Sequence, residues 1–262
     1  MESSISNIPV LFDSELFTRI IPFDENNPLE AGVQSDHTEI ALKTSNNRVI
    51  NSWNISNPAY HCYFQNGENP PFYKTHLFVE MPFVEEVMDE RLAEKSDNQT
   101  TILAERFVQG HVNIQIIVEG YVSFYKDLVD KITALGSKDF QIISMLNESQ
   151  GEVARNITAI LIDTSKFSVL ESGVVFKKYR EEQDFDEQKE LCLPFVHVVD
   201  KETDHSMLVV GVHVHGCGSQ YPKSGLEMLV ITINELQKGV LGSPDVIAAG
   251  DYNTLQCMLE KV

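Results

Sequence analysis

Short apolar runs alternate with segments of helical spacing along most of the chain. Apolar, often β-branched runs bounded by turn-forming residues predict strands, and apolar residues three or four positions apart predict helices. The predicted strands are Ile8–Phe12, Glu39–Lys43, Arg48–Ile55, Leu77–Met81, Val112–Val118, Phe140–Leu146, Thr158–Ile162, Phe167–Phe176, Cys192–Val199, Met207–His213 and Asp245–Ala249. The predicted helices are Val84–Lys95, Thr100–Val108, Tyr121–Leu135 and Leu226–Lys238.

The order of these elements favours one α/β domain. Residues Thr44–Asn47 form turns readily, so they predict a hairpin between Glu39–Lys43 and Arg48–Ile55. Ser96–Asn98 predicts a break between the first two helices, and Met207–His213, the most hydrophobic run, predicts a central strand. The sequence contains no internal repeat and no linker long enough to divide it, so we expect a single domain over residues 1–262.

The composition is that of an ordinary globular protein. Of 262 residues, 42% are hydrophobic and 23% are charged, and no apolar run approaches the roughly 20 residues of a membrane-spanning helix. The polar segment Met1–Ser6 lacks the pattern of a signal peptide, so we expect a cytoplasmic protein. Its four cysteines form no C-x-x-C pair, which excludes a zinc ribbon and favours reduced thiols.

The charge balance narrows the partners. The chain has 20 Lys and Arg residues against 39 Asp and Glu residues, a formal net charge of −19. A need for solubility alone can account for such a charge. The negative charge also disfavours binding to duplex DNA, because proteins bind DNA through cationic side chains that neutralise its phosphates. A genomic duplex is therefore not an expected substrate.

Three polar clusters occur where predicted buried strands end. Glu119 follows Val112–Val118, His213 ends the most hydrophobic run, and Asp251 and Asn253 follow Asp245–Ala249. Ligand sites of α/β proteins gather at such strand ends, and carboxylate, amide and imidazole groups suit a hard metal ion and a phosphate.

Each cluster also has a plainer interpretation. Glu119 can stabilise the N-terminus of the following helix as a charge. His213 can be a buried, hydrogen-bonded histidine, and Asp251 and Asn253 can form an Asx-turn or a helix cap. The chemical interpretation gains weight because all three clusters occupy the same kind of position.

The motifs around these clusters resemble the endonuclease/exonuclease/phosphatase superfamily. The segment Gly-Val-His213-Val-His-Gly, followed by a helix and by Ala-Gly-Asp251-Tyr-Asn253, is similar to the family's pattern. Asn51-Ser-Trp-Asn54-Ile resembles its first strand, Ile-Ile-Val-Glu119 resembles the strand that carries a metal-binding glutamate, and Ala159–Phe167 resembles a mid-chain strand pair. The resemblance runs in family order over residues 48–255. It implies a four-layer α/β sandwich of two packed mixed β-sheets with helices on the outside.

One motif stands out of family order. Ser35-Asp36-His37, followed by an alternating apolar strand, resembles the motif with which the family normally ends. We therefore interpret residues 1–44 as the family's C-terminal end, moved to the N-terminus by circular permutation. The Thr44–Asn47 hairpin then joins the family's last strand to its first.

The resemblance also implies an activity and its residues. It implies a metal-dependent phosphodiesterase or phosphatase, with Mg²⁺, or Mn²⁺ in its place, held by Glu119, Asn54 and Asp36. Asp251 then orients or deprotonates the attacking water, and Asn253 holds that water or a phosphate oxygen. His37 and His213 donate hydrogen bonds to the phosphoryl oxygens.

Three departures from the family pattern leave a second class open. Pro9 stands where the family has an aspartate that orients the closing histidine, and Ser56 replaces a carboxylate found in some members. The segment Lys223–Glu227 lacks an arginine often seen there. The alternative to an enzyme is therefore a catalytically weakened protein of the same fold that serves as a binding or interaction module.

Overall fold

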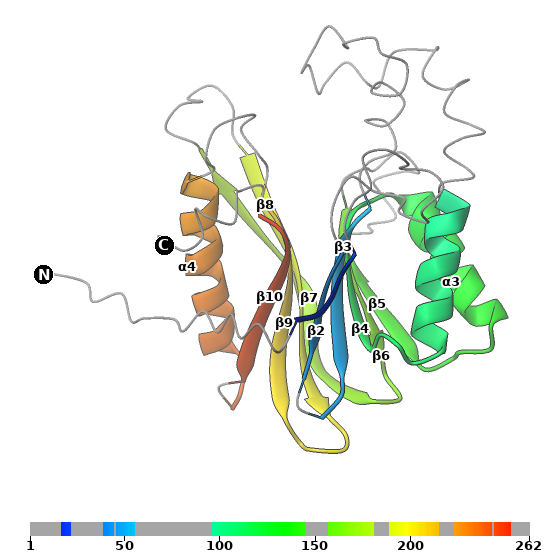
Figure 1. The fold of residues 1–262 in the computed structure, drawn as a ribbon. Helices are drawn as coiled ribbons and strands as arrows, with labels where there is room; N and C mark the ends of the chain where they lie inside the picture. The colour runs from blue at the N-terminus through cyan, green and yellow to red at the C-terminus, as the bar shows by residue number, and fades with distance from the viewer. Residues whose placement is uncertain are drawn as a thin grey trace, which may run out of the picture.

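Two mixed β-sheets packed face to face form the centre of the protein, with helices on both outer sides (Figure 1). The computed structural model describes residues 17–21, 39–44, 46–55, 96–144, 157–180, 189–214, 223–242 and 244–252. The fold is described below from these residues alone.

The first sheet has six strands in the order β1-β2-β3-β4-β6-β5. Its strands β3 and β4 are parallel, whereas the other neighbours are antiparallel. The strands are β1 (Phe17–Ile21), β2 (Glu39–Lys43), β3 (Val49–Asn54), β4 (Ile114–Gly120), β5 (Phe140–Ser144) and β6 (Ile157–Asp163).

The second sheet has four strands in the order β10-β9-β8-β7. Strands β9 (Ser206–His213) and β10 (Asp245–Asp251) are parallel, and β7 (Phe167–Tyr179) and β8 (Lys189–Asp200) complete an antiparallel meander with β9. The most hydrophobic run of the sequence is β9, which has a neighbour on both sides, so its predicted central place is confirmed.

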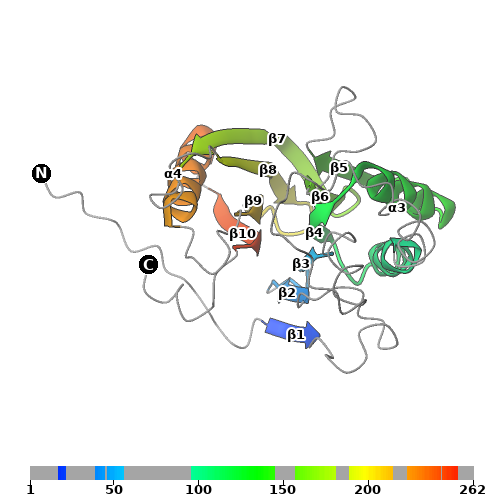
Figure 2. The same ribbon diagram turned by 90° about the horizontal axis from the view of Figure 1, so that it is seen from above.

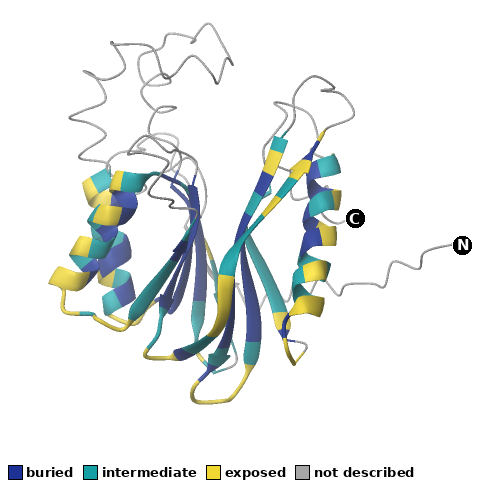
Figure 3. Ribbon diagram, turned by 180° about the vertical axis from the view of Figure 1, so that it is seen from behind, coloured by how far each residue is buried: buried dark blue, intermediate teal, exposed yellow. Residues whose placement is uncertain are grey.

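Three apolar clusters hold four layers together. The cluster between the sheets combines Ile114, Ile116 and Ile160 of the first with Val196 and Val209 of the second. A second cluster packs the outer face of the first sheet against α3 (Val122–Ala134) and a helix over residues 96–108, and a third packs α4 (Lys223–Gly239) on the second sheet. Figure 2 shows these layers from above, and Figure 3 shows that the buried residues line the strands and the inner helix faces. The predicted four-layer α/β sandwich is confirmed.

The helix boundaries follow from local signals. Tyr121 is the extended residue before α3, and Gly136, with φ of 94°, follows its C-cap Leu135, as left-handed residues commonly do after a helix. None of the helices within the described ranges combines the length and apolarity that crossing a bilayer requires.

Two details of the sequence-based prediction are corrected by the structure. Residues 96–98 are helical, so the predicted break at Ser96–Asn98 is wrong. Lys131 of α3 places its Nζ 2.6 Å from Asp97 Oδ1, and the local sequence does not reveal this ion pair. Strand β1 was not predicted, because its five residues mix one arginine and one threonine with three apolar residues and depend on pairing with β2.

The predicted hairpin is confirmed. Strands β2 and β3 are antiparallel, with Ile40 opposite Ser52 and Lys43 opposite Val49. In the turn, Asn47 adopts φ of 62°, a left-handed conformation that asparagine tolerates well. The predicted strands Ile8–Phe12 and Leu77–Met81 and the predicted helix Val84–Lys95 lie outside the described residues.

Candidate active site

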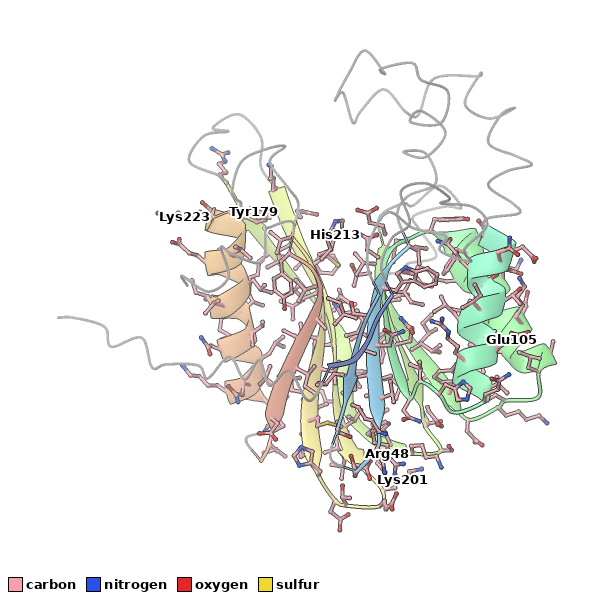
Figure 4. All side chains as sticks on the ribbon, viewed as in Figure 1. Arg48, Glu105, Tyr179, Lys201, His213 and Lys223 are labelled. Atoms are coloured by element: carbon pink, nitrogen blue, oxygen red, sulfur yellow. The ribbon has the colours of Figure 1, made fainter. Side chains whose placement is uncertain are left out.

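The candidate site lies where the carboxyl ends of two parallel strand pairs meet. Strands β3 and β4 run the same way in the first sheet, and β9 and β10 run the same way in the second. Asn54 is the last residue of β3, His213 the last of β9 and Asp251 the last of β10. Figure 4 shows His213 at this end of the sandwich, with Arg48 and Lys201 at the other end.

Strand alternation turns three of the polar side chains toward the space between the sheets. Successive residues of a strand point to opposite faces, so residues two apart share a face. Asn54 shares a face with Ile50, His213 with Val209, and Asp251 with Ile247, and these three apolar residues belong to the cluster between the sheets. The predicted polar strand ends therefore face one another across the two sheets.

Glu119 reaches the same place by breaking this alternation. Glu119 is two residues after Ile117, whose side chain packs on the helix side of the first sheet, so regular alternation would point Glu119 to that side as well. The pairing of β4 with β6 shifts register between Ile117 and Gly120, which is the mark of a β-bulge, and Glu119 has φ of 62°. Non-glycine residues held in this left-handed conformation are uncommon and cluster at functional sites.

The four side chains form one compact polar group. Asn54 donates its amide Nδ2 hydrogen to Asp251 Oδ2 at 2.8 Å, which joins the two sheets. His213 Nε2 lies 3.4 Å from Glu119 Oε1, with 8% and 14% of the two side chains exposed. One ligand atom from each of Glu119, His213 and Asp251 lies within 4.8 Å of the other two.

A close approach of the backbones sets the spacing between His213 and Asp251. The two residues are register partners in β9 and β10, and Val214 donates its N–H to the Asp251 carbonyl at 2.9 Å. Gly250 has φ of 148°, and a Cβ atom there would lie 1.9 Å from the Val212 carbonyl oxygen. Only glycine fits at this position, which explains why the motif places glycine directly before Asp251.

The donor set fits a divalent cation. Oxygen ligands such as carboxylates are those that Mg²⁺ and Mn²⁺ prefer, and this group contains the carboxylates of Glu119 and Asp251. Ligands of one such ion at about 2.1 Å lie at most about 4.2 Å from each other, close to the span of this group. A cation bound between the two carboxylates would reduce their mutual repulsion.

Three of the predicted site residues, Asp36, His37 and Asn253, lie outside the described residues, as do Pro9 and Ser56. The feature that sequence reasoning missed is the bulge that turns Glu119 inward. The glycine directly after Glu119 was a usable signal, since glycine near a strand end often marks a bulge.

Comparison with solved structures identifies the fold. The chain aligns with the mannosyl-6-phosphatase Bt3783 of Bacteroides thetaiotaomicron over 64% of its own length and 61% of that chain, with 17% identity and a TM-score of 0.50. It aligns with an endonuclease/exonuclease/phosphatase family protein of the same bacterium over 64% of its own length and 59% of that chain, with 16% identity and a TM-score of 0.49. It aligns with the catalytic domain of human Nocturnin, solved with a bound sulfate anion, over 60% of its own length and 57% of that chain. The identity is 12% and the TM-score is 0.45.

The chain therefore has the fold of the endonuclease/exonuclease/phosphatase proteins, which its motifs resemble. It spans about three fifths of the length of these three solved structures. No protein-family model matches the sequence, and no curated protein matches it.

Proposed function

We propose that this protein is a metal-dependent hydrolase of phosphoester bonds, a phosphodiesterase or a phosphatase. The observation that carries the proposal is the meeting of Glu119, His213 and Asp251 within 4.8 Å, from strands of two different sheets. Buried or half-buried carboxylates brought together in this way cost stability through their repulsion, so their juxtaposition favours a chemical role.

Each residue of the proposed centre has a distinct role. Glu119, with Asn54 and Asp36, would hold the cation, which when bound neutralises phosphate charge. Asp251 would orient the attacking water and take its proton as the water oxygen bonds to phosphorus and the bond to the leaving oxygen breaks. The hydrogen bond from Asn54 Nδ2 fixes the Asp251 carboxylate for this task.

The phosphoryl-binding groups complete the proposed centre. His213, with Nε2 directed toward Glu119, and His37 would donate hydrogen bonds to phosphoryl oxygens as charge builds in the transition state. Asn253 would hold the water or a phosphate oxygen. With a net charge of −19, the substrate we expect is a small phosphorylated molecule, a nucleotide, a phosphoinositide headgroup or an RNA end.

A substrate panel tests this proposal. Metal-stripped protein would be assayed with and without Mg²⁺ on a chromogenic phosphodiester, sugar phosphates, nucleotides, inositol phosphates, short single-stranded RNA and duplex DNA. We expect Mg²⁺-dependent turnover on at least one of the small or single-stranded compounds and little on the duplex. Binding of a panel compound without any turnover would instead favour the binding-module alternative.

We also propose that residues 1–44 are the permuted closing segment of the fold. The β2–β3 hairpin supports this, because its register places the start of β2 beside the Asn54 end of β3. Only Thr38 lies between His37 and Glu39 in the sequence, so their Cα atoms are at most about 7 Å apart. This short connection supports a role for His37 at the rim where Asn54 and Asp251 meet.

Replacing His37 tests the permutation. His37→Ala should lower kcat on the substrate identified by the panel by about 10²-fold or more, since the residue would stabilise charge in the transition state. His111→Ala removes an exposed histidine from a turn after the 96–108 helix and should leave kcat unchanged. Equal kcat values for wild type and His37→Ala would refute the permuted assignment.

A further inference from the structure

The bulge that turns Glu119 into the site is filled by a tyrosine of the following helix. Tyr125, on the first turn of α3, is 1% exposed. Its hydroxyl donates to the Ile157 carbonyl of β6 at 2.6 Å and lies 3.4 Å from the Ile117 carbonyl of β4. These two carbonyls flank the register shift between β4 and β6.

The third backbone group at this hydroxyl belongs to Gly120. Gly120 is the β4 residue that pairs with Ile157 after the shift, and its backbone hydrogen-bonds with the Tyr125 hydroxyl. A Cβ atom on Gly120 would lie 2.2 Å from that hydroxyl oxygen. The glycine is therefore required by the space that the tyrosine occupies.

At a bulge, some backbone N–H and C=O groups lose their usual hydrogen-bond partner on the neighbouring strand. Buried backbone groups without partners destabilise a fold. Here one hydroxyl contacts backbone groups on both sides of the irregularity. Burial raises the pKa of the Tyr125 phenol well above its usual range, so the hydroxyl keeps the proton that it donates.

We propose that Tyr125 is the positioning residue that holds Glu119 in its left-handed conformation and so sets the affinity of the site for a divalent cation. Without the hydroxyl, β4 gains freedom to return to regular pairing, and regular alternation points residue 119 to the helix side. The part of this inference that concerns cation affinity rests on the proposed function, whereas the part that concerns the bulge does not.

Tyr125→Phe removes the hydroxyl and keeps the ring in its edge-on contact with Phe124. The matched control is Tyr121→Phe, which removes the hydroxyl of the neighbouring aromatic residue, hydrogen-bonded to Ser96 rather than to the bulge. Two measurements separate the variants: amide hydrogen exchange of residues 117–120 in the metal-free protein, and calorimetric titration with Mg²⁺ and Mn²⁺.

We expect Tyr125→Phe to speed exchange at the Gly120 amide and to weaken cation binding by about 10-fold or more, the usual effect of losing a group that orients a metal ligand. Tyr121→Phe should change neither quantity. Unchanged exchange in Tyr125→Phe, or equal changes in both variants, would overturn the positioning role. A wild-type protein that binds no cation would refute the proposed function, and the exchange data would still decide whether Tyr125 holds the bulge.

Discussion

Asp251→Asn should reduce kcat by about 10³-fold while leaving the fold intact. The variant keeps the size and shape of the side chain and still permits a polar contact with Asn54, which now donates to Asp251 Oδ2 at 2.8 Å. It removes the negative charge and the ability to take the proton of the attacking water, and general-base catalysis contributes about 10²- to 10⁴-fold. The measurement is kcat on the substrate identified by the panel, with circular dichroism and the melting temperature as checks on folding.

The same strand offers a matched control for this substitution. Asp245 begins β10, is exposed, and forms a pair of 3.2 Å with His205 at the end of the sheet away from His213. Asp245→Asn should leave kcat within a factor of two of wild type. If Asp251→Asn kept more than a tenth of the wild-type kcat, Asp251 would not be the base.

Asp200→Asn should destabilise the protein by about 3 kcal/mol at neutral pH, because the amide cannot form the charged pair with Arg48. Asp200 is fully buried at the end of β8, and Arg48 of the β2–β3 hairpin places Nε 2.6 Å from its Oδ2. The side chain of Asn46 and the backbone N–H groups of Glu202 and Thr203 also donate to this carboxylate. The pair joins the two sheets, and Arg48 lies at the end of the sandwich opposite His213 (Figure 4).

The loss of stability caused by Asp200→Asn should become smaller as the pH falls. Burial raises the pKa of the Asp200 carboxyl, but hydrogen bonds from Arg48, Glu202 and Thr203 outweigh it and lower the pKa to about 2. A carboxyl whose pKa is lower in the folded state than in the unfolded state, where it is about 4, stabilises the fold above pH 4. That stabilisation is lost as the pH falls from about 4 through 2.

Urea unfolding at pH 7 and at pH 2 measures this dependence. The difference in unfolding free energy between wild type and Asp200→Asn should be large at pH 7 and much smaller at pH 2. Glu202→Gln is the control, because Glu202 also contacts Arg48, at 2.8 Å, but its side chain is 70% exposed. Exposed pairs contribute about 1 kcal/mol or less, so this variant should unfold almost as wild type does. A difference for Asp200→Asn that is independent of pH would contradict the assignment.

Residues whose placement depends on regular geometry were predictable from the sequence. The runs at β4, β9 and β10 are long and apolar, so the strand ends that carry His213 and Asp251 followed from them directly. The hairpin before Asn54 was predictable because its turn residues are diagnostic. The order of these strands and motifs along the chain then matched the pattern of one family, which predicted the fold.

Features that depend on tertiary contacts were not predictable in this way. Strand β1 has too little apolar character to stand out, and it exists through pairing with β2. Periodicity points residue 119 to the wrong side of its sheet, and only the bulge, supported from α3 by Tyr125, turns the Glu119 carboxylate toward His213. Local signals also suggested a break at residues 96–98, where contacts from α3 hold a helix.

The central claim, that Glu119, His213 and Asp251 form a metal-dependent hydrolytic centre, is tested most directly by the dependence of turnover on Mg²⁺ concentration after chelation. Wild-type protein and Glu105→Gln, which changes an exposed glutamate of the 96–108 helix, should both be inactive without metal and regain full turnover as Mg²⁺ is restored. Glu119→Gln should stay inactive at every Mg²⁺ concentration tested. Turnover that survives chelation, or Mg²⁺ activation of Glu119→Gln equal to that of wild type, would contradict the claim.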